Sequence, residues 1–536
     1  MSETAAPPDG LSSDGRPAPP RGNRLAPLAG TLRAIPPEAL LVGACLFALL
    51  AVFVAADPSS HVTASNSPFT DEGYNTANAR NLVQLGRWSM DEWNLYLANL
   101  PFTLVEAVWF RLVGVGIVGA RLVTIACVSL AATGLVWGLR GVVGRATALF
   151  AGLAFATSGL VLVYGRLAYL EDMVVLGLTL GTLVLARDDR LTMRWGALSG
   201  VCYAVAIGAK PSAAFAVAGI LVAMVAALAP HDRAARRWVA GALGAIALAG
   251  LVWAVVIWLP NREAVAMDLR IWASDSLSIV PRDMLRSALR YFTTDSDSIY
   301  GMQAGPLLAL GATGLAAIAV LRRRLSRAQA RLAAVSIGWL AIGFGILLTA
   351  SYRPNRYVLP LLPPLAMLAA LGLYVAQQWL RERPWTPAPA APAEAGASPE
   401  PRLRTWRHAA HWTAPALLVS VAAVAVTPGL VWYGSWARNA TYDLPDIQAR
   451  FASAVPAGER VAGQQSALYL MTSGAITIVT QIPANEGDLY AEGVRWYLVP
   501  AEDPAPAGVS TATWAARERV MCGDYGGVSE CLFHVS

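Results

Sequence analysis

Long apolar stretches recur along most of the chain, and they decide what it can fold into. A helix that crosses the hydrocarbon core of a bilayer needs about 20 mostly apolar residues. Of the 536 residues, 56% are hydrophobic and 14% are charged, whereas about a quarter of a soluble protein is charged. We therefore predict an all-α polytopic membrane protein with about eleven transmembrane helices, near residues 39–56, 120–139, 146–164, 173–186, 195–209, 212–229, 238–259, 304–321, 332–350, 357–378 and 412–432.

The arginines between these spans predict the orientation of the chain. Short loops rich in Arg or Lys stay on the cytoplasmic side of a membrane. Five connections fit this rule: the turn Arg140 to Arg145, "RDDRLTMR", "HDRAARR", "RRRLSRAQAR" and the Arg-bearing linker 379–411. A span at residues 101–117 would reverse the orientation, so we predict an amphipathic helix in the membrane interface there. The protein is then expected in the cytoplasmic (inner) membrane, with large outward loops at 57–119 and 260–303.

Composition divides the chain into five parts. Residues 1–35 are rich in Pro, Gly and Ser and are predicted to form a disordered cytoplasmic N-terminus. A transmembrane module, 36–380, is followed by a Pro- and Ala-rich cytoplasmic linker, 381–411, and by the last span, 412–432. Residues 433–536 mix the strand-like runs "ALYLMT", "AITIVT" and "VRWYLV" with Pro and Gly. This pattern predicts a small extracytoplasmic α/β domain.

Two cysteines lie in this C-terminal part. Cys522 and Cys531 stand in "VMCGDYGGVSECLFHV", where turn residues separate two strand-like flanks. Disulfides persist in oxidising compartments outside the cytoplasm. We predict a Cys522–Cys531 disulfide that closes a hairpin.

Ionisable residues collect at the outer ends of the predicted spans. An ionisable group at membrane depth is costly, so its presence indicates function. Cations bind an anionic headgroup, and a neighbouring carboxylate can accept a proton. Lys210 is the only lysine of the chain, and its Lys–Pro step ends one span and opens the next. The full set is Asp71, Glu72, Arg80, Arg121, Arg166, Glu171, Asp172, Lys210, Arg353 and Arg356.

Five motifs in this set resemble those of the GT-C glycosyltransferases that use polyprenyl-phosphate sugars. They are "TDEGYNTANARNLVQLGRW" after the first span, "GARL" at 119–122, "YGRLAYLED" at 164–172, "GAKP" at 208–211 and "RPNRYVLPLLPPLAML" at 353–368. The Asp-Glu motif and the Arg-Tyr-x-Leu-Pro run are the more specific ones. Within this superfamily the chain looks like the protein O-mannosyltransferases, the aminoarabinose transferases of lipid A and the bacterial members of glycosyltransferase family 39.

The resemblance implies a membrane transferase that moves one sugar, with inversion, from a polyprenyl-phosphate donor to a hydroxyl. The acceptor is a protein, a lipid or a polysaccharide on the outer face. Asp71 is then the base, and Glu72 orients the acceptor or supports Asp71. Cations stabilise the leaving phosphate. The candidates for this role are Arg80, Arg121, Lys210, Arg353 and Arg356, and further site candidates are Arg166, Glu171 and Asp172.

Several of these residues also have a structural interpretation. Asp71 at the start of a helix acts equally as an N-terminal cap, because acidic side chains there interact well with the helix dipole. Lys210 and Arg121 at span ends can anchor a helix at the interface. Arg80 can lie on a solvated helix face.

The region after the third span leaves a second choice open. Arg166 and Glu171 lie five residues apart and can form a structural ion pair. Relatives more often have a single acid after that arginine, so the "LED" run leaves Glu171 and Asp172 as alternatives. The spacing favours Glu171.

Other function classes remain as alternatives. The five histidines are dispersed and no Cys/His cluster has zinc spacing, although Asp71, Glu72 and Glu171 could supply oxygens to a divalent cation. No glycine fingerprint for a nucleotide is present, and nucleic acid is not an expected partner. A polytopic transporter or flippase for a lipid-linked or envelope glycan precursor is the alternative function, and a non-catalytic envelope scaffold is the third.

Overall fold

The computed structural model describes most of the chain. The described residues are 35–58, 71–86, 99–186, 191–227, 232–263, 305–349, 355–382 and 400–536 except 481–487, 507 and 526–527, with a few single positions between 265 and 284. Arg353, most of the loop 260–303 and most of the linker lie outside these residues. The predictions made for the N-terminal 34 residues also fall outside them.

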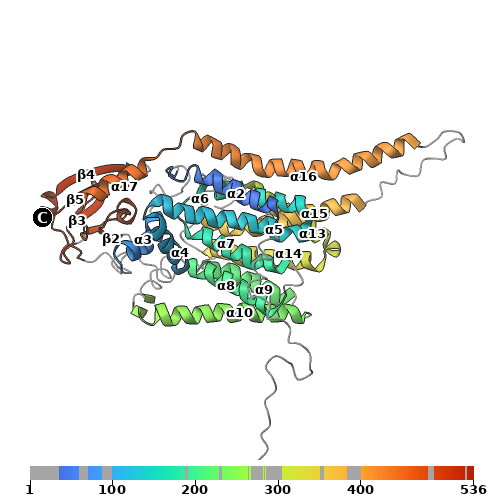
Figure 1. Cartoon of the computed structure of the whole chain (residues 1–536), viewed down its shortest axis with the longest axis horizontal. Helices are drawn as coiled ribbons and strands as arrows, with labels where there is room; N and C mark the ends of the chain where they lie inside the picture. The colour runs from blue at the N-terminus through green and yellow to red at the C-terminus, as the bar shows by residue number, and fades with distance from the viewer. Residues whose placement is uncertain are drawn as a thin grey trace, which may run out of the picture.

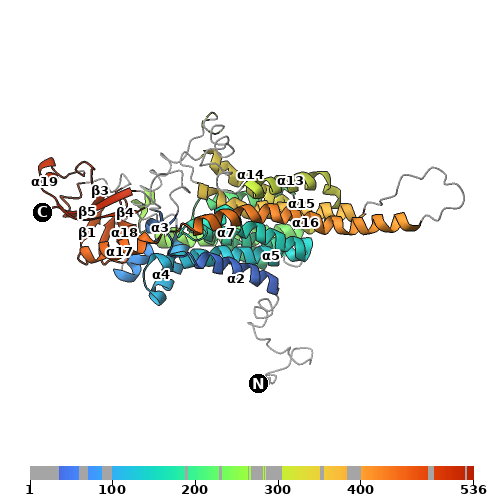
Figure 2. The ribbon, with the colours of Figure 1, turned by 90° about the horizontal axis from the view of Figure 1, so that it is seen from above.

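Helices form one elongated bundle, with a small sheet at one end (Figures 1 and 2). The longest, α5 and α16, run along the bundle. The helices are α2 (Pro37–Ala51), α5 (Ile117–Ala156), α6 (Gly159–Tyr164), α7 (Leu170–Leu183), α8 (Met193–Ala209), α9 (Ala213–Ala227), α10 (Arg233–Trp253), α13 (Gly305–Val320), α14 (Arg327–Thr349), η6 (Asn355–Leu361), α15 (Leu362–Glu382) and α16 (Glu400–Ala437).

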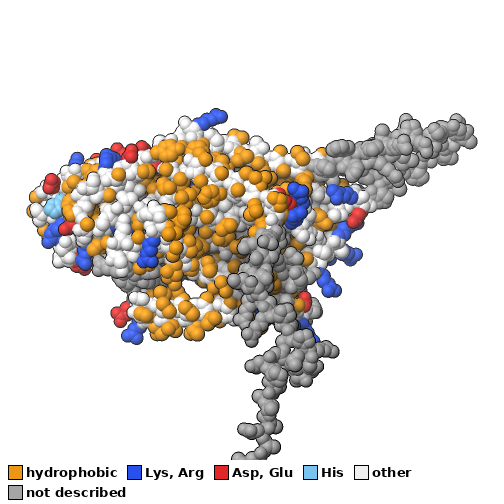
Figure 3. Space-filling view, in the orientation of Figure 1, with side chains coloured by type: hydrophobic (Ala, Val, Ile, Leu, Met, Phe, Trp, Pro, Cys, Tyr) orange, Lys and Arg blue, Asp and Glu red, His pale blue; other side chains and the backbone are white. Residues whose placement is uncertain are grey.

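The bundle has the surface of a multi-pass membrane protein. Hydrophobic side chains cover the middle of the face in Figure 3, and charged ones gather toward its ends. Among the described residues, five helices are long and apolar enough to cross a membrane, and three more are apolar but shorter. The five are Ile117–Ala156, Arg233–Trp258, Arg327–Gly345, Asn355–Glu382 and Ala416–Ala437. The count of eleven spans stays a prediction.

The second predicted span is the first half of α5, and the third is the second half of α5 together with α6. Gly144 interrupts the helix with φ 75° and ψ 167°, a conformation that glycine adopts without steric cost. The chain turns back there, so that the two halves of α5 pack against each other. The contact is close, since a Cβ on Gly152 would lie 2.3 Å from Val136. Beside this turn, Arg140 and Arg145 form ion pairs with Glu38 at the start of α2, at 3.4 and 3.1 Å.

Lys210 and Pro211 end α8 as the sequence predicts. Lys210 has φ −152° and ψ 116°, which is the extended conformation that a residue before proline prefers. Helix α9 then begins at Ala213. The lysine is therefore held at a helix end beside the site described below.

Two shorter helices, α3 (Asp71–Gln84) and α4 (Leu100–Val113), lie between the bundle and the sheet (Figure 1). Helix α3 is polar, yet every residue from Glu72 to Asn81 is buried. Its close fit depends on Gly73, where a Cβ would meet the backbone of Leu468 at 2.5 Å. Side chains of α3 therefore meet protein on all sides.

The C-terminal domain is a mixed sheet with helices, as its strand-like runs predict. The strand order is β2-β1-β3-β5-β4, with β1 parallel to β2 and β3, and β5 antiparallel to β3 and β4. The elements are α17 (Asp443–Ala454), β1 (Arg460–Ala462), α18 (Ser466–Tyr469), β2 (Ile476–Ile478), β3 (Trp496–Pro500), α19 (Thr511–Ala515), β4 (Glu518–Tyr525) and β5 (Val528–His534).

One strand prediction in this domain is wrong. The run "ALYLMT", residues 467–472, forms the end of α18 and a turn rather than a strand. Every side chain from Ala467 to Met471 is buried. Periodicity cannot distinguish a short run that is buried on all sides from a strand.

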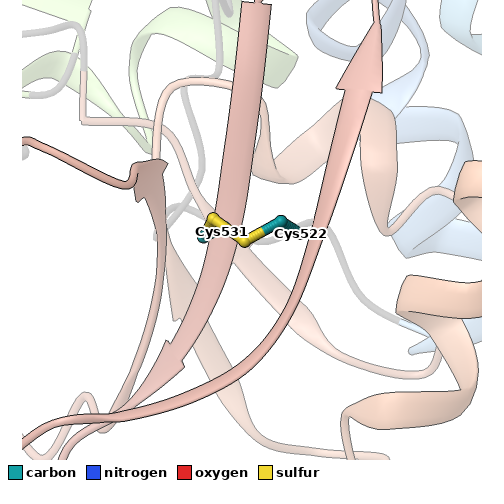
Figure 4. The surroundings of a disulfide bond; sticks show 2 residues. All are labelled: Cys522 and Cys531. Atoms are coloured by element: carbon teal, nitrogen blue, oxygen red, sulfur yellow. A yellow bond between two sulfur atoms is a disulfide. The ribbon is translucent and has the colours of Figure 1, made fainter.

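A disulfide joins the two strands of the C-terminal hairpin. Cys522 and Cys531 are directly opposite each other in β4 and β5 and are bonded to each other (Figure 4). The same hairpin carries Tyr525, whose ring packs against Tyr469 with centroids 6.2 Å apart. The cross-link therefore fixes the register of the strand that bears Tyr525.

Glu530, on β5, predicts a pH effect on stability. Burial, with a smaller contribution from the charge of Asp503, raises the pKa of its carboxyl to about 8, against about 4.3 in an unfolded chain. The folded protein therefore binds more protons, and stability falls as the pH rises from about 4.3 to about 8. We expect Glu530→Gln to remove this decline and to stabilise the protein at high pH by on the order of a few kcal/mol.

Thermal unfolding of the purified full-length protein at several pH values tests this expectation. The matched control is Glu518→Gln, which removes an exposed carboxylate from the neighbouring strand β4. It should keep the native pH dependence. The expectation is wrong if Glu530→Gln and Glu518→Gln give the same pH profile.

Candidate functional site

Asp71 is the first residue of α3 and the most exposed carboxylate of the site. Its side chain is 24% exposed, and its Oδ2 forms an ion pair with Nη2 of Arg356. Arg356 lies in η6, which immediately precedes α15. The two specific sequence motifs therefore meet in space, although 284 residues separate Asp71 from Arg356.

Glu72 points elsewhere and forms a fully buried ion pair. Its two carboxylate oxygens accept hydrogen bonds from Nε and Nη2 of Arg121, at 2.8 and 2.7 Å, and both side chains are 0% exposed. Glu72 also accepts a bond from the backbone N–H of Ala168 at 2.9 Å. Nη1 of Arg121 donates to the carbonyls of Val54 and Ala56, both at 2.9 Å. This network fastens α3 to α5 and to the ends of α2 and α6.

Arg166 belongs to the same buried region and not to an ion pair with Glu171. Its Nη1 donates to the carbonyl of Ala56 at 2.6 Å, and its Nη2 to that of Asp57 at 3.1 Å. The guanidinium lies 4.1 Å from the ring centroid of Trp436. The predicted structural pair is therefore wrong, because Arg166 faces the end of α2 while Glu171 faces a pocket.

That pocket lies between α7, α9, α14 and η6. Glu171, Lys210 and Tyr357 line it together with mainly apolar residues. Lys210 Nζ donates to Glu171 Oε1 at 2.6 Å and lies 4.2 Å from the ring centroid of Tyr357. Arg356 Nε is 3.4 Å from the same glutamate oxygen. We call Asp71, Glu171, Lys210 and Arg356 the pocket charges.

Asp172 is adjacent to Glu171 but does not join the pocket charges. It is 0% exposed, and neither of its carboxylate oxygens has a hydrogen-bond partner among the described residues. Glu106, on α4, is buried in the same manner. Of the two acids that the sequence leaves as alternatives, the geometry favours Glu171 as the one that contacts cations.

Arg80 binds the C-terminal domain. Its Nη1 donates to Thr477 Oγ1 at 3.2 Å, and its Nη2 donates to the carbonyls of Ser473 and Ala475. Tyr74, on the same helix, donates to the carbonyl of Gln464 at 3.0 Å. Arg80 is fully buried, so the solvated-face interpretation is wrong. The contacts couple α3 to the sheet.

Sequence reasoning missed one residue of this junction, Asp57. Its carboxylate oxygens accept hydrogen bonds from the backbone N–H groups of Asp443 and Leu444, at 2.6 and 3.1 Å. It therefore caps α17 of the C-terminal domain from the end of the first span. The sequence signal for Asp57 is its position directly after an apolar run. Many carboxylates at a membrane interface share that position, so it does not indicate a contact with the C-terminal domain.

Asp71, Glu72 and Glu171 each contact a cation. Within the part of the chain that the structure describes, no three His, Cys, Asp or Glu residues form a group that could hold a metal ion. Glu72 faces Arg121, whereas Asp71 and Glu171 face Arg356. A divalent cation shared by these three acids would require these pairs to separate.

Comparisons with known proteins place this geometry in a known fold. No protein-family model matches the sequence, and no match is found among curated proteins. The solved structure of ArnT from Cupriavidus metallidurans bound to undecaprenyl phosphate matches with a TM-score of 0.60 at 16% identity, over 95% of this chain and 98% of that one. This chain therefore shares the fold of ArnT. The apo state of the same ArnT matches with a TM-score of 0.59, 16% identity and the same coverage.

The GT-C resemblance read from the motifs is thus confirmed at the level of the fold. The match extends over the C-terminal sheet as well as the bundle, because it covers 95% of this chain. At 16% identity it carries no information about donor, acceptor or individual side chains.

Proposed function

We propose that this protein is an integral membrane glycosyltransferase that transfers one sugar from a polyprenyl-phosphate donor to an acceptor hydroxyl, with inversion. The observation that carries the proposal is the meeting of Asp71, Lys210 and Arg356 beside one pocket. A carboxylate for the proton and two cations for a phosphate are the groups that this reaction needs. ArnT, which shares the fold, binds undecaprenyl phosphate.

Asp71 is the base in this mechanism. The acceptor hydroxyl gives its proton to the Asp71 carboxylate while the oxygen attacks the anomeric carbon of the sugar. The bond from that carbon to the phosphate oxygen breaks in the same step, and the configuration inverts. Glu72 supports the base indirectly, because its bidentate pair with Arg121 fixes the first turn of α3.

Lys210 and Arg356 hold the leaving group. The phosphate keeps the electron pair of the broken bond, and the two cations stabilise its growing charge. Arg353 belongs to the same motif and remains a candidate for this role. Arg121 and Arg80 act instead as positioning residues, since their donors are directed to Glu72, backbone carbonyls and Thr477.

A transporter or flippase is the alternative. Its polar groups are expected near the middle of the membrane in broken helices. Here the pocket charges lie at helix ends: Asp71 begins α3, Glu171 is in the first turn of α7, Lys210 follows α8, and Arg356 precedes α15. This arrangement favours a transferase that works at one face. The proposal also places the site on the extracytoplasmic side. The Arg140–Arg145 turn contacts Glu38 at the start of α2, whereas Asp57 follows the other end of that helix. Because an Arg-bearing turn is expected in the cytoplasm, the end of α2 near Asp57 is expected outside.

An assay in detergent distinguishes the two functions, because a solubilised protein separates no compartments. Purified protein is mixed with polyprenyl-phosphate sugars and acceptors extracted from the envelope of its own organism. A transferase releases free polyprenyl phosphate and produces a new glycoside. A transporter leaves the lipid-linked sugars intact, and that result would contradict the proposal.

A further inference from the structure

The pocket charges form ion pairs with one another. Arg356 contacts both Asp71 and Glu171, and Lys210 contacts Glu171. Two cations and two carboxylates are therefore in contact, and their formal charges balance. A phosphate that enters finds its cations already paired.

The two carboxylates differ in their freedom to move away. The Glu171 side chain is 2% exposed and contacts both cations, whereas that of Asp71 is 24% exposed and pairs with Arg356 at the first residue of α3. Like charges at close range repel strongly in a site of low dielectric constant. We therefore expect a phosphate that binds Arg356 to displace the more exposed acid, Asp71.

We propose that the donor phosphate displaces Asp71 from Arg356, so that the Asp71–Arg356 pair is a latch that keeps the base occupied until the donor is bound. This inference rests on the proposed function. Glu171 stays in place as a positioning residue, and it holds Lys210 and Arg356 side by side for the phosphate. Release of Asp71 then makes its carboxylate available to the acceptor hydroxyl in the donor complex.

Coupling between two binding events is reciprocal. If the phosphate must break the latch, then a variant without the latch binds the phosphate more tightly. Asp71→Asn keeps the shape of the side chain and removes its charge. We expect it to bind undecaprenyl phosphate about tenfold more tightly than the native protein, within the range usual for such couplings. A residue that merely helped to bind the ligand would give the opposite sign.

The test is the dissociation constant of undecaprenyl phosphate for purified full-length protein in detergent. Asp71→Ala is a second variant with the same expected sign. Asp446→Asn is the matched control, because it makes the same substitution at an exposed acid of α17 that is not one of the pocket charges. It should leave the affinity unchanged.

Each outcome decides the inference. Tighter binding by both Asp71 variants and unchanged binding by Asp446→Asn support the latch. Equal or weaker binding by the Asp71 variants overturns the latch but leaves the proposed donor intact. Tightening of the same size in Asp446→Asn also overturns it, because the loss of any negative charge would then suffice. No saturable binding by the native protein overturns the proposed donor and the latch together.

Discussion

Arg121→Ala will destabilise the folded protein by about 3–5 kcal/mol, the usual cost of leaving one member of a buried ion pair without its partner. Glu72 and Arg121 are both 0% exposed and are joined by two hydrogen bonds. The variant leaves the Glu72 carboxylate buried without its cation, and it also removes the donor to two backbone carbonyls. Thermal or denaturant unfolding of the purified protein measures the loss.

Two further variants test the cause of this loss. Arg450→Ala removes an exposed arginine from the C-terminal domain and should change stability by less than about 0.5 kcal/mol. Combining Arg121→Met with Glu72→Gln removes both charges, so the double variant should be more stable than Arg121→Ala. If Arg121→Ala and the Arg450→Ala control have the same unfolding midpoint, the Glu72–Arg121 ion pair does not stabilise the position of α3.

Asp71→Asn will lower the rate of sugar transfer by about 10²–10⁴-fold, the usual contribution of a positioned general base. The amide cannot accept the hydroxyl proton. The fold should persist, because the Asp71 side chain is partly exposed and begins the helix. Turnover of a purified donor and acceptor, measured with the unfolding temperature of the same sample, separates lost chemistry from lost structure.

The control for Asp71→Asn is Asp446→Asn, which changes an exposed acid of α17 that is not one of the pocket charges. It should transfer sugar at the native rate. The latch adds a second expectation, since Asp71→Asn should lose turnover while its affinity for the lipid phosphate rises. Native turnover in Asp71→Asn would rule out this residue as the base.

The sequence predicts that the pocket charges lie at one end of the spans, because the residue types and the predicted topology both lead to that position. Asp71, Glu171, Lys210 and Arg356 were all expected at one end of the spans, and the structure joins them by ion pairs. The Lys–Pro step shows why: proline ends α8 and fixes Lys210 at a helix end. Local rules of this kind are visible in a single sequence.

The roles of the other arginines could not be predicted, because they depend on tertiary contacts. Successive helix residues point about 100° apart, so Asp71 faces Arg356 while its neighbour Glu72 faces Arg121. Nothing in the motif says which acid takes which direction. Arg80 bonds Thr477, which lies 397 residues away in the chain. The strand that receives it was predicted, but its position against α3 was not.

The most direct test of the central claim is an analysis of envelope glycans in three strains of the source organism. In the first the gene is deleted, in the second the native gene is restored, and in the third the Asp71→Asn gene is restored at equal protein level. The account predicts that one glycosidic linkage is lost in the first and third strains and present in the second. Recovery of that linkage in the Asp71→Asn strain would contradict catalysis by Asp71 and favour a transport or scaffold role.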